Sequence, residues 1–201
     1  MTILTLEHDL QEDLRRVLDL LPETSVNTKD DSEFKKSINQ LPPELLCTVN
    51  KVANIALQIL RDNDYVQIRG YPKGCDARSI LLIGHAVGEI FDDLTHQASI
   101  VSEASPTINA TLQGNQTEAL FLHTDFAMLN VPPEATIIQC VDPDPLGQAF
   151  GENGVSVARH IFSKYFGSKK LELIKKTLLP FAGKKPDGST VLIMRPILEV
   201  C

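Results

Sequence analysis

His123 and Asp125 are the residues of this sequence whose types and spacing fit metal chemistry best. They follow the apolar run Leu120-Phe121-Leu122, which predicts a β-strand. Residues i and i+2 of a strand share a face, so both side chains are expected to project into a barrel interior. One imidazole and one carboxylate supply two corners of a two-histidine, one-carboxylate triad, which leaves positions on Fe(II) for a co-substrate and O₂. The spacing therefore predicts a metal site with His123 and Asp125 as ligands.

The segments around this motif decide how it is interpreted, because a His-X-Asp tripeptide often arises by chance. On its own it is most simply a histidine at a strand end beside a solvated aspartate. Here the proline pair of Val131-Pro132-Pro133 follows it, and residues 136–141 form a second apolar segment that contains Cys140. Upstream, residues 65–72 alternate like a strand and end in Arg69-Gly70-Tyr71-Pro72.

Together these segments resemble the taurine-dioxygenase and clavaminate-synthase-like superfamily of Fe(II)/2-oxoglutarate oxygenases. In that family an apolar strand leads into His-Thr-Asp or His-Thr-Glu, a proline pair follows, and an early strand ends in Arg-Gly-x-Pro. The resemblance covers about residues 41–200. It implies a double-stranded β-helix that binds Fe(II) and the co-substrate 2-oxoglutarate. It also implies attack on an unactivated C–H bond, so the expected reaction is hydroxylation or desaturation of a small metabolite, such as an amino acid or natural-product intermediate.

The resemblance also suggests a residue for the co-substrate. Members of the family usually carry a threonine or serine that contacts 2-oxoglutarate, and Ser156 in Asn153-Gly154-Val155-Ser156 matches its position. A glycine-rich turn that enters a strand is the simpler explanation of the same residues. Ser156 is therefore a candidate for co-substrate binding, with the turn as the alternative.

Two further family residues have no counterpart in this sequence. The family needs a second histidine farther along the chain and then an arginine, whose guanidinium pairs with the distal carboxylate of 2-oxoglutarate. After Asp125 there is only His160, which lies too early and in a segment typical of a helix start. Arg195 follows no suitable histidine and is interpreted as a strand or edge residue. We expect either a chain cut before its distal segment or a non-catalytic member, and the apolar ending favours the first.

The order of predicted elements indicates an α+β chain. Apolar residues at helical spacing predict helices over residues 6–21, from Leu41 onward, over 77–91 after a cap at Asp76, and over 158–165 and 171–179. Strands are expected at residues 65–69, 107–112, 118–123, 135–141, 155–158 and 190–200. This order predicts a helical extension over residues 1–40 and an oxygenase-like domain over 41–201. That domain is expected to be a jelly-roll, incomplete at its C-terminal end, with the N-terminal helices packed on it.

Composition limits the partners of this chain. It has 201 residues, of which 43% are apolar, and a net charge of −7, so no nucleic-acid partner is expected. No apolar stretch is long enough to cross a bilayer and no signal peptide begins the chain, so no membrane partner is expected. The four cysteines form no Cys-X-X-Cys pair, which favours free thiols in a reducing cytoplasm. The oligomeric state stays open.

Two other functions remain open at this stage. The first is a non-catalytic or truncated β-helix protein that binds a small ligand or a partner, because the distal histidine and arginine are missing. The second is a metal-dependent hydrolase that uses His123 and Asp125 together with Glu103 or Asp144. His85 lies in an apolar segment and is expected to be a structural residue of a helix. The sequence does not identify the substrate, because specificity in this class lies in variable loops.

Overall fold

The computed structural model describes residues 2–74, 76–91, 99–103, 125, 129, 131, 133–147, 154–184 and 188–198. The chain divides into two compact units. Unit 1 comprises Met1–Leu94, Ala98–Ala104 and Thr136–Glu152. Unit 2 comprises Thr95–Gln97, Ser105–Ala135 and Asn153–Cys201.

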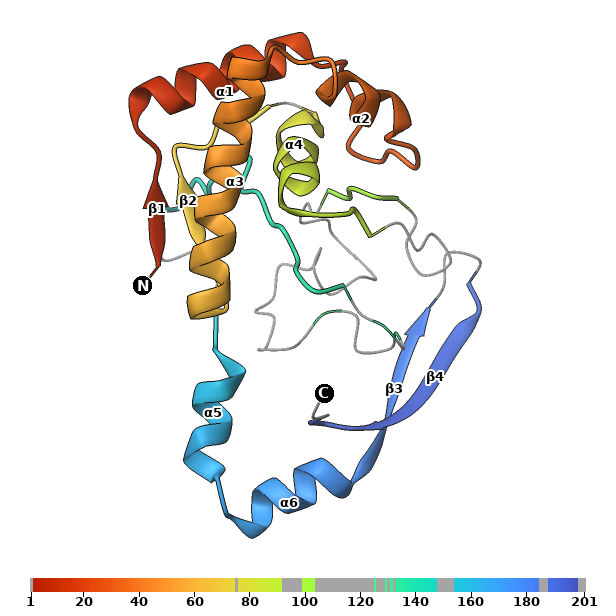
Figure 1. The fold of residues 1–201 in the computed structure, drawn as a ribbon. Coiled ribbons are helices and arrows are strands. Elements are labelled where there is room, and N and C mark those ends of the chain that lie inside the picture. The colour runs from red at the N-terminus through yellow and green to blue at the C-terminus, as the bar shows by residue number, and fades with distance from the viewer. Residues whose placement is uncertain are drawn as a thin grey trace. The chain divides into compact units, whose positions relative to one another are not determined.

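Unit 1 contains four helices and one small sheet in its described part (Figure 1). The helices are α1 (His8–Leu20), α2 (Ser32–Ile38), α3 (Pro43–Asn63) and α4 (Arg78–Val87). Strands β1 (Ile3–Thr5) and β2 (Gln67–Arg69) pair in parallel, with Leu4 opposite Ile68. Pro43 lies in the first turn of α3, where its missing N–H leaves no hydrogen bond unmade.

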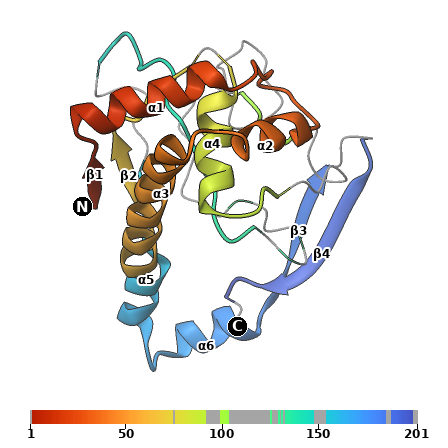
Figure 2. The same ribbon diagram turned by 45° about the horizontal axis from the view of Figure 1, so that its top comes forward.

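The core of unit 1 lies where α1, α3 and α4 pack together, with α1 crossing the other two (Figure 2). Each helix contributes residues at helical spacing, so that one face is apolar. The buried core residues are Leu6, Leu14, Val17, Leu18, Leu21, Phe34, Leu41, Leu45, Val49, Val52, Ala77, Leu81 and Leu82. Residues 1–40 therefore share their core with α3 and α4, while the domain boundary predicted after residue 40 stays a prediction.

Unit 2 has two short helices followed by a β-hairpin in its described part (Figure 1). These elements are α5 (Ala158–Tyr165), α6 (Lys169–Lys176), β3 (Leu178–Lys184) and β4 (Thr190–Pro196). Ser168 caps α6, because its Oγ accepts a hydrogen bond of 3.2 Å from the backbone N–H of Leu171. Strands β3 and β4 are antiparallel, with Leu179 opposite Arg195.

Three predicted elements are corrected by the structure. Residues 135–141 and 154–157 form neither helix nor strand, so the strands predicted there are wrong. The helix predicted over residues 171–179 begins at Lys169 and ends at Lys176, and β3 starts at Leu178. Apolar side chains alone do not make a strand, because a strand also needs a partner for its backbone hydrogen bonds.

The predicted jelly-roll stays a prediction. The described residues contain two separate two-stranded sheets, and they form no closed barrel. The strands expected at residues 107–112 and 118–123 lie outside the described residues. Within the described part of the chain, no helix has both the length and the apolar composition that crossing a membrane requires.

Candidate functional site

The predicted iron ligands are only partly described by the structure. His123 lies outside the described residues, whereas Asp125 is exposed and lies in a turn. Among the described residues, no group of three or more histidine, cysteine, aspartate or glutamate side chains is arranged to hold a metal. A metal held by His123 and Asp125 therefore stays a prediction. Glu103 and Asp144, the carboxylates considered for a hydrolase, are both exposed.

The segment that follows the motif is anchored to the hairpin of unit 2. Leu129 is buried, and its carbonyl oxygen accepts a hydrogen bond of 2.8 Å from Nη1 of Arg195 on β4. Arg195 was expected to be a strand residue, and it lies on β4. Its guanidinium thus helps to position the chain four residues beyond Asp125.

Ser156 lies in the irregular stretch that leads into α5, where Val157 is the N-cap residue. Its side chain is exposed. A contact between Ser156 and 2-oxoglutarate stays a prediction. The alternative, a glycine-rich turn that enters a strand, is wrong in its second part, because this stretch leads into helix α5.

Two segments that carry the family resemblance contact each other in unit 1. Gln139 Nε2 donates a 2.9 Å hydrogen bond to Oγ of Ser79, and the hydroxyl of Ser79 donates to the carbonyl oxygen of Pro72. Nζ of Lys73 donates to the carbonyl oxygen of Val141 at 2.7 Å. Ser79 is fully buried, so its satisfied hydroxyl fixes this contact. The segment after the proline pair is therefore held against the turn that follows β2.

Gly70 in the Arg-Gly-Tyr-Pro turn has a structural reason to be glycine. Its φ is +80°, a conformation that other residues rarely adopt. A Cβ atom added at Gly70 would lie 2.6 Å from Nε2 of Gln11, which itself donates to the carbonyl oxygen of Leu6. This turn therefore needs glycine for its backbone conformation, whereas the flexible side chain of Gln11 could move away from a Cβ atom.

A cleft of about 400 Å³ lies between α1 and the residues that follow β2. Its lining includes the cations Arg15, Lys73 and Arg78 and the carboxylates Asp19 and Asp76. The sequence did not predict this cleft, because the residues from α1 and those after β2 are far apart in the chain.

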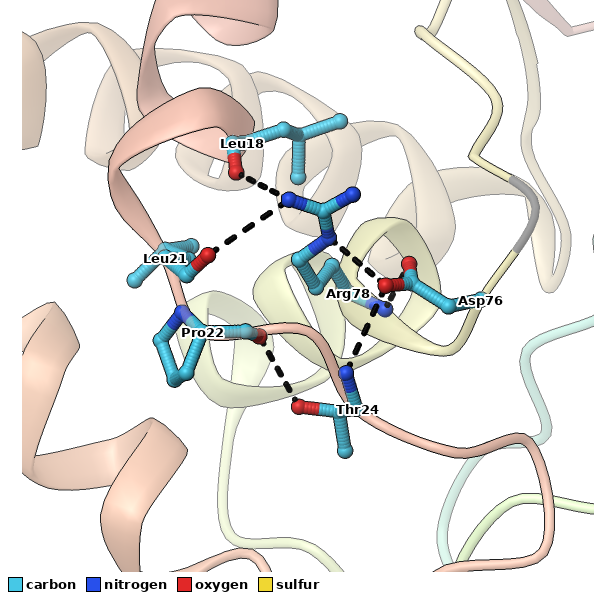
Figure 3. Close-up of polar contacts among 6 residues, drawn as sticks. All are labelled: Leu18, Leu21, Pro22, Thr24, Asp76 and Arg78. Atoms are coloured by element: carbon cyan, nitrogen blue, oxygen red, sulfur yellow. Dashed lines mark hydrogen bonds and ion pairs between the residues drawn. The ribbon is translucent and has the colours of Figure 1, made fainter.

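Arg78 and Asp76 line this cleft and contact each other and the end of α1. Figure 3 shows these polar contacts. Nε of Arg78 lies 2.8 Å from Oδ2 of Asp76, and its Nη1 donates to the carbonyl oxygens of Leu18 and Leu21 at 3.0 and 3.5 Å. Those carbonyls lie at the C-terminal end of α1, where a cation is stabilising. The carbonyl oxygen of Leu18 also accepts a 3.3 Å hydrogen bond from the backbone N–H of Leu21. Oδ1 of Asp76 also accepts from the backbone N–H of Arg78 at 3.2 Å. The N-cap residue of α4 is Ala77, so the cap predicted at Asp76 lies one residue too early. The pair therefore joins α1 to α4.

We expect Arg78→Ala to lower the free energy of unfolding by about 2–3 kcal/mol, because it leaves carbonyls and a partly buried carboxylate without their cation. Urea unfolding followed by circular dichroism measures this change. Arg16→Ala is the matched control, since Arg16 is exposed and contacts only Asp13 at 3.2 Å among the ion pairs of the described residues. Its expected effect is within about 0.5 kcal/mol. Equal losses in the two variants would contradict the role given to Arg78.

His85 is a structural residue, in agreement with the sequence prediction. Its Nε2 lies 2.8 Å from Oδ2 of Asp31, and its ring stacks on Phe34 with centroids 6.1 Å apart. These contacts join α4 to the start of α2. The sequence offered no sign of Asp31 as the partner, because it lies in a polar segment.

The hydroxyl of Tyr71 is buried in unit 1. Burial raises the pKa of the Tyr71 hydroxyl well above its ordinary value of 10.0. Its oxygen has no hydrogen-bond partner among the described residues. The ring packs against the core of unit 1, so Tyr71 contributes apolar contact.

Comparison with known proteins finds no relative. No family model matches the chain, and no curated protein or solved structure matches it. The motif of His123 and Asp125 is therefore the feature of the chain that best indicates a function.

Proposed function

We propose that this chain carries the iron-binding half of a cytoplasmic Fe(II)/2-oxoglutarate-dependent oxygenase. Its substrate would be a small metabolite, such as an amino acid or a natural-product intermediate, which it hydroxylates or desaturates with O₂. The observation that carries the proposal is the His123-Thr124-Asp125 motif, followed by a proline pair and an apolar segment. The contact of Gln139 with Ser79 supports it, because it joins the segments on which the resemblance depends.

The residues of this chain have limited and separate tasks in the proposed reaction. His123 and Asp125 hold the metal, and Ser156 is the candidate for contact with 2-oxoglutarate. When bound, iron and 2-oxoglutarate together supply the activation of O₂. Arg195 and Lys73 position the chain on either side of the proline pair through the carbonyls of Leu129 and Val141.

The direct test is formation of succinate from 2-oxoglutarate by the purified protein with Fe(II) and O₂. We expect succinate to form when a panel of amino acids is offered, and not when a chelator removes the iron. Failure of the whole panel would argue against amino acids as substrates. Failure of the protein to bind Fe(II) under anaerobic conditions would overturn the assignment as an oxygenase.

The second candidate is a non-catalytic protein that binds a small ligand or a partner. One observation favours it: the only histidine after Asp125 is His160, which is exposed on α5 and was not assigned as a ligand. Saturable binding of 2-oxoglutarate without any succinate would support this candidate. Both functions can include binding of 2-oxoglutarate, but only the oxygenase forms succinate.

A further inference from the structure

The segment that contains α5 and α6 is strongly basic, although the chain as a whole is acidic. Residues 158–176 include the cations Arg159, Lys164, Lys169, Lys170, Lys175 and Lys176 and a single carboxylate, Glu172. Glu172 lies 4.0 Å from Lys175 and 3.5 Å from Lys176, so it neutralises charge at the C-terminal end of α6. From Arg159 to Lys170 the segment contains no carboxylate. Lys164, Lys169 and Lys170 are exposed.

The same segment exposes an apolar stripe. Ala158, Ile161, Phe162 and Tyr165 recur at helical spacing and so lie on one face of α5. No residue of α5 is buried, and Ile161 and Tyr165 are 42% and 40% exposed. Phe166, in the turn between the two helices, is 88% exposed. A helix of two turns is stable mainly through packing of its apolar face, so this face needs a covering surface.

We propose that α5, α6 and the turn between them dock on an anionic lipid bilayer, with Phe166 and Ile161 entering the headgroup region. Lysines beside aromatic and aliphatic side chains are typical of helices that lie in a membrane interface. The cations complement acidic headgroups, each contributing attraction near the surface. Phe166, the most exposed aromatic ring of the segment, projects from a turn that has lysines on both sides. A lipid surface can deform around such a ring. A peptide partner would instead need a groove.

This inference departs from the expectation that the chain has no membrane partner. That expectation came from the lack of a spanning segment and of a signal peptide, and neither bears on docking at a bilayer surface. The net charge of −7 does not oppose such docking either. Net charge averages over the whole chain, whereas attraction to lipid decays within about 10 Å in salt and depends on the local cations. Docking of this kind does not depend on the proposed oxygenase activity.

The test is flotation of the purified protein with vesicles of equal parts phosphatidylcholine and phosphatidylserine. We expect the protein to float with these vesicles, to remain behind with pure phosphatidylcholine, and to dissociate as salt is added. The double variant Lys169→Gln/Lys170→Gln should lower the partition coefficient about 20-fold. Phe166→Ser should lower it about tenfold, because it removes the most exposed of the inserted apolar side chains.

The matched control is Lys35→Gln/Lys36→Gln, which makes the same change of charge on exposed lysines of α2. We expect its partition to stay within about twofold of the parent protein. The Lys169/Lys170 variant should fold, because removing cations from the first turn of α6 is favourable to the helix dipole. No flotation, or an equal loss in both double variants, would overturn the proposal. Binding to single-stranded RNA without flotation would assign the segment to nucleic acid and also overturn it.

Discussion

His123→Ala is expected to weaken Fe(II) binding by about 100-fold or more and to abolish iron-dependent succinate formation. Removing a partner that merely orients a metal ligand typically lowers affinity by about 10–100-fold, so loss of a ligand should do at least as much. Asp125→Asn should have a similar effect, because an amide carries no charge to balance the cation. Anaerobic titration with Fe(II) against a competing chelator measures the affinity, and a succinate assay measures turnover.

Matched controls separate loss of the site from a general effect of substitution. His160→Ala removes an exposed histidine of α5, and Asp144→Asn removes an exposed carboxylate in unit 1. We expect both controls to bind Fe(II) within about twofold of the parent protein. If His160→Ala lost iron while His123→Ala kept it, the predicted ligand pair would be wrong. If all four variants bound equally, the iron would lie elsewhere in the protein.

The sequence predicted the helices well because their signals are local. Apolar residues at helical spacing predicted α1, α3, α4 and α5, and Pro43 marked the first turn of α3. Helix α2 is not among the predicted helices, since its seven residues contain only two large apolar side chains, Phe34 and Ile38. A local signal of that size does not separate a helix from a loop.

Strands were predicted less well because their stability depends on distant partners. Residues 135–141 are largely apolar, as in a strand. In the structure they are held instead by side-chain hydrogen bonds, from Gln139 to Ser79 and from Lys73 to the carbonyl oxygen of Val141. Strand β3 was not predicted, because its local pattern is helical while a distant strand pairs with it. The apolar pair Leu178-Leu179 continues the helical spacing of α6, and the partner strand β4 that overrides it is remote from that local pattern.

In the candidate site, too, the sequence could predict local motifs but not contacts between residues far apart in the chain. The motif of His123 and Asp125 is a local pattern, so the sequence could predict it as a ligand pair. The contact of Arg78 with the carbonyl oxygen of Leu18 joins residues 60 positions apart. Nothing in the residues beside Arg78 indicates that its side chain binds the carbonyl oxygens at the end of α1. Contacts to backbone carbonyls of this kind leave no pattern in residue type.

Leu14→Ala is expected to lower the free energy of unfolding of unit 1 by about 3–4 kcal/mol, the second large effect that we predict. Leu14 is fully buried in the core that α1 shares with α3 and α4, so truncation leaves a cavity. Urea unfolding measures the loss. The chain has no tryptophan and three tyrosines. Tyr71 can therefore serve as the single reporter of unit 1 in a background with Tyr65→Phe and Tyr165→Phe.

The control for this cavity is Leu20→Ala, a change of the same chemistry on the same helix. Leu20 is 58% exposed, so we expect a loss within about 1 kcal/mol. The reporter also tests whether residues 1–40 fold separately. Because Tyr71 packs against the shared core, a single core requires its transition to shift with Leu14→Ala. If helicity fell while the Tyr71 transition stayed in place, residues 1–40 would be an independent extension, and the shared core would contribute little to stability.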